Sequence, residues 1–438
     1  MSIERYSTEI SKLFSEEYKY KTWAEVEIAL LKAYVNLGIF DKKDIDFEEL
    51  EHAKNSLDPK RIKEIEKEIN HDLMAVIKAL NEKAPKSGKF LHVGATSYDI
   101  EDTATALIFK KAFEIILNEL TKTLILLKEK AIKFENTICI GRTHGQHALP
   151  TTYGMKFALY YQDFLRCKKR ILEAKERIFT GKMSGGVGTM AGFFGKGIEI
   201  EKEVMKELGL NYAKISTQII QRDVHAEAMF LLTLIACNAE KIAKEIRNLQ
   251  RTEISEVLEM FEEKQVGSST MPHKRNPHKA ERICSLAKLI RSNLNVALEN
   301  IALEHERDLT NSANERFIFA QEFILTHYIL RELNKILANM KIYEAKAKEN
   351  LGITKGLIFA ERIMLELTKK GMNRQEAHEL VRKLAQKSYD EKIDFKELLS
   401  ANEIIKKFLT KEDIEEMFKP ENYLGNYKEL IKRAIEEN

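Results

Sequence analysis

Residues 218–265, which read QIIQRDVHAEAMFLLTLIACNAEKIAKEIRNLQRTEISEVLEMFEEKQ, contain neither glycine nor proline. Apolar side chains recur through this stretch at the spacing of one face of an α-helix. The recurring positions are Ile220, Val224, Met229, Leu232, Ile235, Ile242, Ile246, Leu249, Ile254, Val257 and Leu258. A single helix through all of it would be about 70 Å long, which exceeds the width of a typical globular domain. The stretch therefore predicts a long helix that buries its apolar face against other helices.

Helical patterns dominate the rest of the chain as well. The ranges 102–134, 151–180 and 278–305 also predict helices, and the section after Tyr343 predicts several shorter ones. Strand-like alternation of apolar and polar residues is nearly absent. The sequence therefore predicts an all-α fold. Because helices of this length must bury long apolar faces, we expect them to pack with helices of other subunits.

The composition is that of a globular protein with a charged surface. The 438 residues are 44% hydrophobic and 32% charged, so the chain is long enough for more than one domain. Lys and Arg number 71 and Asp and Glu 68, which gives a formal net charge of +3. Proteins that bind nucleic acid or membrane surfaces usually carry a field of one sign, so we expect neither partner here. A small anionic ligand is compatible with this balance, because a local group of arginines needs no net charge.

Cysteine usage and the N-terminus indicate the compartment. Cys139, Cys167, Cys237 and Cys284 lie far apart without paired spacing, so the sequence predicts neither a zinc site nor a disulfide framework. The first residues, MSIERYSTEISKLFSEEYKY, are charged from Glu4 onward and lack an apolar signal segment. The sequence also contains no uninterrupted apolar run long enough to span a bilayer. We therefore expect a soluble cytoplasmic protein.

The segment GSSTMPHKRNP, residues 267–277, interrupts the helical pattern. It holds two of the chain's 6 prolines, Pro272 and Pro277, and neither permits a helix through this segment. Gly267 permits backbone angles that other residues disfavour. The segment therefore predicts a loop of defined shape that presents its polar side chains rather than packing them.

A second break in the pattern is rich in glycine. The segment GKMSGGVGTMAGFFGKG, residues 181–197, contains the pattern GxGxxA at Gly186, Gly188 and Ala191. No apolar strand precedes it, so the context of a dinucleotide-binding fingerprint is missing. A phosphate-binding P-loop also fails, because Lys196 is followed by Gly197 where Ser or Thr is required. We interpret the segment as a mobile loop between long helices.

Polar residues also gather in four further segments. They are NHDLMA (70–75), LHVGATSYDIEDTA (91–104), GRTHGQHALPTT (141–152) and EHERDLTNSANERF (304–317). His144 and His147 have a spacing that some metal ligands share, but Gly145 and Pro150 predict a loop there, and neither an HExxH motif nor a cysteine partner is present. The segments instead offer proton-transfer groups and donors for anions. This combination indicates acid–base chemistry on a small polyanion without metal or cofactor, and by itself it favours His144 as the base.

In combination these segments resemble the fumarase/aspartase superfamily, whose members release fumarate from a succinyl-bearing substrate. GSSTMPHKRNP with the following HKAERICSLA, GRTHGQHA and HVGATSYDIEDTA resemble its three shared regions, in the same order. IERYSTEIS (3–11), WAEVEIALLKAYVNLG (23–38), STQIIQRDVHAE (216–227) and HERDLTNSANERF (305–317) resemble the branch that acts on succinyl purine nucleotides. The likeness is weakest after residue 350.

The resemblance implies both an architecture and an assembly. It predicts a three-domain, all-α fold with a helical domain at 1–94, a central long-helix bundle at 95–346 that carries the signature loop, and a C-terminal helical domain at 347–438. It also implies a homotetramer in which each active site is built from three subunits. The predicted helix length independently favours such an assembly.

The resemblance also assigns roles to individual residues. Ser268 is the base that removes a proton from the succinyl carbon, His144 is the acid that protonates the departing nitrogen, and Glu281 orients His144. The residues expected to hold the anionic intermediate are Lys274, Asn276, Ser269 and Thr96 or Ser97. The residues expected to contact the phosphate and nucleotide are Arg5, Tyr6, Gln218, Arg282, Arg307, Ser312 and Arg316. His92, Asp72 and His71 complete the pocket, and His71 is also expected to take part in catalysis. Asn70, predicted to contact substrate, and Lys19 stand where relatives commonly have arginine.

Two other functions are less consistent with the sequence than the release of fumarate from a succinyl purine nucleotide. A 3-carboxy-cis,cis-muconate cycloisomerase of the same superfamily is less consistent with the sequence, because Arg5, Tyr6 and the set Arg307, Ser312 and Arg316 suit a phosphate that its substrate lacks. A protein that kept the scaffold without catalysis would be expected to have lost some of the catalytic residues. Ser268, Lys274, Asn276 and His144 are all present.

Overall fold

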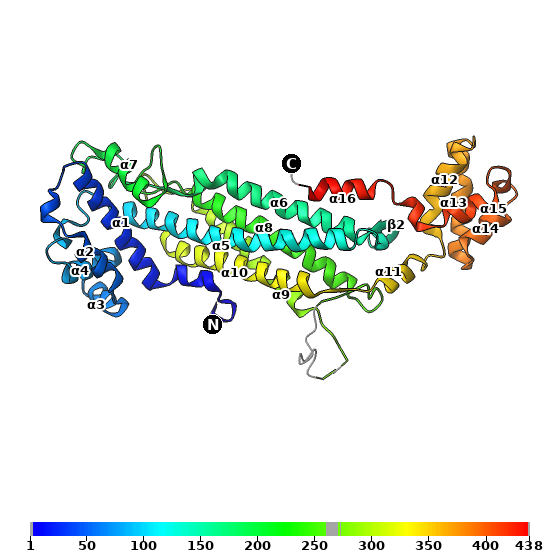
Figure 1. Ribbon diagram of the computed structural model, residues 1–438, viewed down its shortest axis with the longest axis horizontal. Helices are drawn as coiled ribbons and strands as arrows, with labels where there is room; N and C mark the ends of the chain where they lie inside the picture. The colour runs from blue at the N-terminus through cyan, green and yellow to red at the C-terminus, as the bar shows by residue number, and fades with distance from the viewer. Residues whose placement is uncertain (1–2, 260–269, 272, 437–438) are drawn as a thin grey trace. The chain divides into compact units, whose positions relative to one another are not determined.

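The computed structural model of the protein describes residues 3–259, 270–271 and 273–436, and they are mainly helical (Figure 1). The predicted all-α class is confirmed. The α-helices are α1 (Glu16–Asn36), α2 (Phe47–Asn55), α3 (Pro59–Ile69), α4 (Asp72–Lys83), α5 (Ser97–Lys133), α6 (Tyr153–Ile178), α7 (Gly197–Leu208), α8 (Arg222–Leu249), α9 (His278–Glu299), α10 (Ser312–Asn339), α11 (Glu344–Leu351), α12 (Ala360–Lys369), α13 (Arg374–Glu391), α14 (Phe395–Ala401), α15 (Lys411–Met417) and α16 (Tyr427–Ile435). The strands are β1 (Ile138–Thr143), β2 (Gln146–Thr152), β3 (Thr180–Gly181), β4 (Asn211–Tyr212), β5 (Val257–Leu258) and β6 (Lys341–Ile342).

The chain divides into two compact units. Unit 1 consists of residues 1–121, 166–239 and 284–331, and unit 2 of residues 122–165, 240–283 and 332–438. The boundaries fall within α5, α6, α8, α9 and α10, so each unit contains part of each of these five helices. The division into domains at residues 94 and 346 stays a prediction.

Short helices with strong start signals form the N-terminal part of unit 1. α1 packs against α2, α4 and α7, and α3 packs against α4 (Figure 1). The side chain of Ser15 caps α1 by accepting a hydrogen bond from the N–H of Tyr18 at 3.2 Å. Asp46 caps α2 in the same way, with its Oδ1 3.1 Å from the N–H of Glu49. Such caps satisfy backbone donors that the first helical turn leaves unpaired.

A buried ionic network holds the long helices of unit 1 in register. Arg222, at the start of α8, donates from Nη1 to Asp102 of α5 at 2.9 Å and from Nε to Glu315 of α10 at 2.8 Å. The side chain of Arg222 is 1% exposed, so water does not screen its ion pairs with Asp102 and Glu315. Removing one member of such a network typically costs about 3–5 kcal/mol, because it leaves a buried charge uncompensated. The network therefore fixes the positions of α5, α8 and α10 relative to one another.

One buried carboxyl group in unit 1 predicts a pH dependence of stability. Glu322 of α10 is fully buried and accepts a hydrogen bond from Thr233 of α8 at 3.0 Å. Burial raises its pKa from 4.5 to about 8. The folded state therefore holds a proton between these pH values that the unfolded state has released. We expect the free energy of unfolding to fall by about 1.4 kcal/mol per pH unit across this window from this group alone, and Glu322→Gln to remove that slope.

Urea unfolding at pH 5.5 and pH 7.5 tests this expectation. Glu379 of α13 provides a matched control, because a hydrogen bond and ion pair with Arg382 lower its pKa from 4.5 to about 2. Its contribution to stability is present above pH 4.5 and is lost only as the pH falls towards its folded pKa. Glu379→Gln should leave the difference between pH 5.5 and 7.5 unchanged. An equal difference in wild type and Glu322→Gln would contradict the assignment to Glu322.

Unit 2 contains an antiparallel hairpin and a separate helical cluster. β1 pairs with β2 in a register that places Arg142 opposite His147 and Thr143 opposite Gln146. The base of the hairpin packs into a small core in which Ile140 meets Leu351 of α11 and neighbouring apolar side chains. The helices α12–α15 enclose another apolar core (Figure 1) that includes Ile363, Phe395 and Ile414. The several short helices predicted after Tyr343 are thus confirmed.

The predicted helix through residues 218–265 is wrong in its second half. α8 ends at Leu249, after 28 residues and about 42 Å. The N–H of Glu256 then donates to the carbonyl of Leu249 at 3.0 Å, which turns the chain back. β5 pairs with β6 in place of a further helical turn. Residues 260–265, the end of the predicted helix, lie outside the described residues.

Three other predictions need correction in detail. The segment 141–152, expected as a loop, forms most of the β1–β2 hairpin, with Pro150 within β2. The helix expected over 278–305 ends at Glu299, six residues early, and the next helix, α10, begins at Ser312. The glycine-rich segment is mostly irregular, as expected, but its residues 181–185 are buried. The other two predicted helices, 102–134 and 151–180, correspond to α5 and α6 within a few residues.

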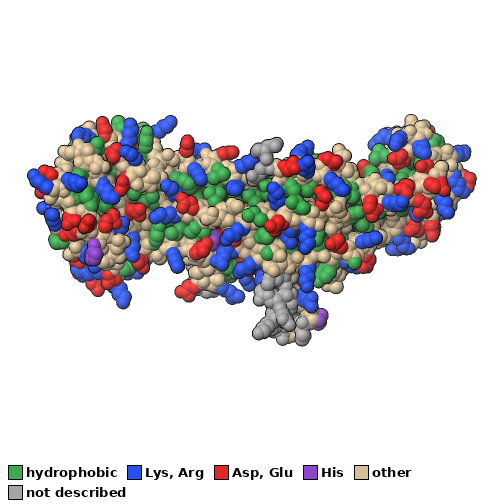
Figure 2. Space-filling view, in the orientation of Figure 1, with side chains coloured by type: hydrophobic (Ala, Val, Ile, Leu, Met, Phe, Trp, Pro, Cys, Tyr) green, Lys and Arg blue, Asp and Glu red, His purple; other side chains and the backbone are tan. Residues whose placement is uncertain are grey.

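The exterior agrees with the balanced composition. On the face shown in Figure 2, basic and acidic side chains are interspersed over the helices, with apolar side chains between them. None of the helices described has both the length and the apolar content needed to cross a membrane.

Candidate active site

The start of α5 carries two predicted site residues on a rigid support. The buried carboxylate of Asp99 accepts hydrogen bonds from the N–H of Thr96 at 2.9 Å and the N–H of Ser184 at 2.8 Å, and it forms an ion pair with Lys182. The loop before α5 and the glycine-rich segment are thereby joined. Their backbones also meet closely, since a Cβ on Gly94 would lie 2.6 Å from the carbonyl oxygen of Gly192. The backbone of Thr96 is therefore fixed by these buried contacts, and Ser97 follows it directly at the start of α5.

Two predicted histidines of unit 1 are placed differently. His71 caps α4, is 44% exposed, and its Nε2 lies 3.4 Å from Oγ of Ser97. His92 instead contacts α1, with Nδ1 2.7 Å from Oε1 of Glu27. Burial alone would lower the pKa of His92, but the hydrogen bond and charge of Glu27 outweigh it and raise the pKa. His71 thus offers an accessible ring, whereas one nitrogen of His92 is committed to holding the turn in place.

Arginine side chains gather around Tyr98 in unit 1. The guanidinium carbon of Arg307 lies 3.4 Å from the ring centroid of Tyr98, and its Nη1 donates to Gln218 at 2.9 Å. Among the described residues, Nε and Nη2 of Arg307 are buried without a hydrogen-bond partner. The hydroxyl of Tyr98 donates to Ser312 at 3.3 Å. Buried arginine donors normally have partners, so this arrangement is suited to an anion.

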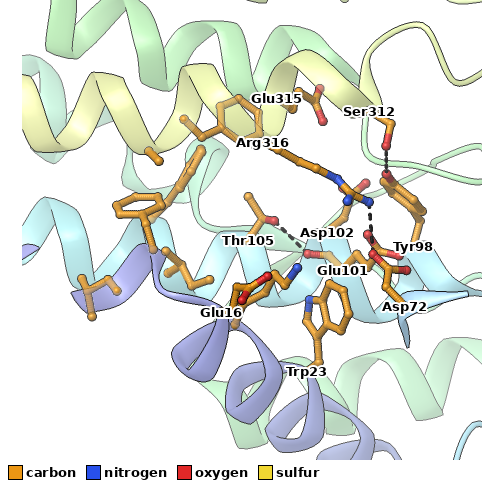
Figure 3. Close-up of a pocket in the computed structure, with 17 residues that line it drawn as sticks. Glu16, Trp23, Asp72, Tyr98, Glu101, Asp102, Thr105, Ser312, Glu315 and Arg316 are labelled. Carbon is orange, nitrogen blue, oxygen red and sulfur yellow. Dashed lines mark hydrogen bonds and ion pairs between the residues drawn. The ribbon is translucent and has the colours of Figure 1, made fainter. Parts of the chain in front are cut away.

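A pocket of about 330 Å³ lies beside this group (Figure 3). Arg316 reaches over it and pairs with Asp72, with Nη2 and Oδ2 3.1 Å apart. Burial and the charges of Asp72 and Asp102 raise the pKa of Glu101 on its wall to about 8. The lining also includes Lys19, whose pKa burial lowers. At neutral pH the carboxyl of Glu101 is therefore mostly protonated and adds little negative charge to the lining.

The remaining predicted residues of unit 1 differ in exposure, from the exposed Arg5 and Asn70 to the half-buried Tyr6. Arg5 is exposed in a short 3-10 helix, and Tyr6 packs edge-on against Tyr328 with ring centroids 5.2 Å apart. Asn70 ends α3 in the left-handed conformation at φ 53°, which asparagine adopts more readily than most residues. The ammonium of Lys19 lies 4.7 Å from the ring centroid of Trp23. Asn70 and Lys19, which stand where relatives commonly have arginine, thus have local structural roles.

In unit 2, His144 lies at the tip of the β1–β2 hairpin. His144 and Gly145 form the two-residue turn, with φ of 54° and 76°. Positive φ at both positions is the geometry that matches the twist of paired strands. The side chain of His144 is exposed. His147 lies further down β2, where burial and Arg142 lower its pKa.

The hairpin is attached to a buried glutamate. Arg142 donates from Nη2 to Oε1 of Glu256 at 2.5 Å, and the side chain of Glu256 is fully buried. Tyr153 donates to the other carboxylate oxygen at 2.7 Å, and Asn350 donates to Oε1 at 2.8 Å. Glu256 is not among the residues predicted from the sequence. The only available signal was an acidic residue at an otherwise apolar helical position, which patterns alone do not distinguish from an exposed one.

The C-terminal end of the signature loop is also anchored by a glutamate. Glu259 accepts hydrogen bonds from the N–H of Lys279 at 3.0 Å and of Ala280 at 2.7 Å, at the start of α9. Lys274 is exposed, and its N–H donates to the carbonyl of Met271 at 3.0 Å. Asn276 is half-buried just before α9. Ser268 and Ser269, the predicted base and its neighbour, lie outside the described residues.

Two predicted residues follow on α9. Glu281 is exposed, and its Oε1 lies 3.9 Å from Nη2 of Arg247. Nη1 of Arg282 lies 3.5 Å from Oε2 of Glu332. The expected contact of Glu281 with His144 stays a prediction. The predicted residues thus form two sets, one in each unit. The set in unit 1 holds His71 and the nucleotide and phosphate residues other than Arg282, and the set in unit 2 holds His144, Lys274, Asn276, Glu281 and Arg282.

The side chains described here hold no group of three or more His, Cys, Asp and Glu residues arranged to bind a metal ion. Taken together, the two sets contain two exposed imidazoles, those of His71 and His144, with several cationic groups and neutral hydroxyl donors. Such groups transfer protons and stabilise anions.

Comparison with known families agrees with this chemistry. The sequence model of a lyase family matches residues 4–291, and that of the adenylosuccinate lyase C-terminus matches residues 356–434. The chain belongs to the lyase family.

Individual relatives narrow the assignment. The adenylosuccinate lyase of Pyrococcus horikoshii is 48% identical over 98% of this chain and 95% of its own length. That of Methanocaldococcus jannaschii is 46% identical over 98% of this chain and 94% of its own length. Within the lyase family, the chain belongs with the adenylosuccinate lyases.

Solved structures share the fold at lower identity. A fumarate lyase from a Mesorhizobium species matches with a TM-score of 0.90 and 27% identity, over 98% of both chains. The 3-carboxy-cis,cis-muconate lactonizing enzyme of Pseudomonas putida matches with a TM-score of 0.90 and 26% identity, over 99% of this chain and 98% of its own. The higher identity to adenylosuccinate lyases favours that branch over the cycloisomerase alternative.

Proposed function

We propose that this protein cleaves adenylosuccinate to AMP and fumarate, and the corresponding succinyl-aminoimidazole carboxamide ribotide to its carboxamide and fumarate. Both are carbon–nitrogen eliminations in purine nucleotide biosynthesis. The identity to adenylosuccinate lyases supports this reaction class.

One observation carries the choice of a phosphorylated substrate. Arg307 directs two buried, unpartnered N–H groups beside Tyr98, within the described residues, and Ser312 adjoins the same tyrosine. A planar guanidinium with free donors matches phosphate oxygens. A carboxymuconate has no phosphate to satisfy them.

The proposed chemistry proceeds by proton removal and proton donation. Ser268, in its alkoxide form stabilised by the nearby Lys274, takes a proton from the succinyl carbon next to a carboxylate and becomes a neutral hydroxyl. The electron pair left on carbon forms a doubly charged aci-carboxylate. Lys274 and Asn276, with Ser269 and Thr96 or Ser97, stabilise that charge as it develops. His144 then donates a proton to the departing nitrogen as the carbon–nitrogen bond breaks. The products are fumarate and the amino-bearing nucleotide, so atoms and charges balance.

We propose that the site is completed by self-association as a homotetramer in the cytoplasm. Large apolar side chains on the long helices are exposed in the single chain, among them Leu159 of α6 at 53%, Leu289 of α9 at 52% and Phe317 of α10 at 66%. Exposed apolar side chains along helices of this length support the proposal that the helices pack against other subunits. In the proposed tetramer, the unit 1 set of one subunit and the unit 2 sets of others form each site, and Glu281 meets His144 between subunits. Light scattering of the purified chain measures the subunit number.

An ultraviolet assay of the purified protein with adenylosuccinate, without added metal or cofactor, tests the proposed reaction. We expect AMP and fumarate to form in equal amounts. An assembled protein that releases neither product from either purine substrate, yet converts 3-carboxy-cis,cis-muconate, would replace this proposal with the cycloisomerase.

A further inference from the structure

The carboxylate of Glu256 joins three separate parts of unit 2. Tyr153 is the first residue of α6 and Asn350 belongs to α11, and both donate to this carboxylate, at 2.7 and 2.8 Å. The amide of Asn350 also donates to the carbonyl of Ile254 at 2.8 Å. The N–H of Tyr343 donates to the carbonyl of Glu256 at 2.8 Å. Backbone and side chain of Glu256 are therefore fixed by contacts that do not involve the hairpin.

The third partner, Arg142, brings the hairpin to this fixed point. Its Nη2 lies 2.5 Å from Oε1 of Glu256, and it is two positions before His144 in the chain. In the strand register, Arg142 lies opposite His147 and Thr143 lies opposite Gln146. Only this last pair separates Arg142 from the His144–Gly145 turn. The position of the Arg142 side chain therefore constrains the strand pair immediately next to the tip.

The contact depends on charge as well as on shape. Burial would raise the pKa of Glu256, but hydrogen bonds from Arg142, Asn350 and Tyr153 outweigh burial and lower it. The carboxylate is therefore ionised at neutral pH and neutralises the Arg142 guanidinium, which is 16% exposed. A neutral amide at this position would keep the size of the side chain and lose that compensation.

We propose that Glu256 is a positioning residue for His144: it anchors Arg142 and so holds the hairpin tip at the place from which His144 donates its proton. The proposal rests on the acid role of His144 in the proposed function. The register of β1–β2 and the buried anchor are independent of that role. A displacement of a catalytic group by about 1 Å can lower a rate by about 10²-fold, so a modest shift of the tip has a measurable effect.

The variant Glu256→Gln tests the proposal. We expect kcat for fumarate release to fall by about 10- to 100-fold while KM changes by less than about threefold, because the nucleotide contacts in unit 1 are untouched. The matched control is Asp163→Asn, which removes a partly buried ion pair with Lys241 in the same unit, at 2.7 Å, away from the hairpin. Asp163→Asn should lower the thermal midpoint without a comparable loss of kcat. If both variants lost kcat in proportion to their thermal midpoints, Glu256 would be merely structural.

Hydrogen–deuterium exchange provides a readout that does not require activity. We expect faster exchange in peptides from residues 138–152 in Glu256→Gln, but not in Asp163→Asn. Unchanged exchange together with unchanged kcat would overturn the proposal. If the wild-type protein releases no fumarate but exchange is still faster in Glu256→Gln, the anchoring is supported and the proposed function is rejected separately. Should Glu256→Gln not fold, Arg142→Lys carries the same test, since it keeps the charge but not the planar donor geometry.

Discussion

Replacing His144 by alanine is expected to lower kcat for fumarate release by about 10²- to 10⁴-fold, the range that general acid catalysis supplies. The departing nitrogen needs a proton as its bond to carbon breaks, and His144 presents an exposed imidazole at the tip of a short hairpin. KM should change little, because His144 is not among the proposed phosphate contacts, most of which lie in unit 1. Steady-state kinetics with adenylosuccinate, together with light scattering to verify assembly, measure both effects.

The turn geometry requires its own control for this prediction. His144 has φ of 54°, a conformation that asparagine tolerates better than alanine. His144→Asn therefore keeps the turn and removes the acid, and it should lose as much kcat as alanine does. Gln146, exposed on the other side of the turn, is the neutral comparison, and Gln146→Ala should stay near wild type. Recovery of activity in the asparagine variant alone would mean that turn shape, not proton donation, explains the alanine result.

The fold class could be predicted from sequence because it depends on long, uninterrupted helical patterns. α5 and α6 lie within a few residues of their predicted ranges. The end of α8 at Leu249 was not predicted, because the strand pairing that replaces further helix joins Val257 and Leu258 to Ile342 and Lys341, which are distant in the chain. The hairpin was hidden in a similar way, since Gly145 and Pro150 indicate a loop until the strand partners are known.

The site residues show the same difference between local and distant information. The signature segments identified Arg307, Ser312 and His144 through their residue types and order. The stacking of Arg307 on Tyr98 and the anchoring of Thr96 by Asp99 and Lys182 join residues that are distant in the chain or ordinary in composition. Lys182 in particular lies within a glycine-rich segment interpreted as mobile, yet its side chain is fully buried.

Replacing Arg307 by methionine is expected to lower kcat/KM for adenylosuccinate by about 10²- to 10³-fold, the loss that follows removal of one buried partner of a charged group. Methionine keeps much of the side-chain length and removes the guanidinium donors. Arg307→Lys should recover only part of the loss, because an ammonium does not reproduce the planar donor geometry above Tyr98.

A substrate without its phosphate shows whether the loss belongs to the phosphate contact. The wild type should process succinyladenosine much more slowly than adenylosuccinate, whereas Arg307→Met should discriminate far less between the two. The coupling follows because variant and truncated substrate each remove one half of the same interaction. If Arg307→Met instead weakened both substrates equally, Arg307 would act by holding Tyr98 and Gln218 in place, and the argument from its unpartnered donors to a phosphorylated substrate would fail.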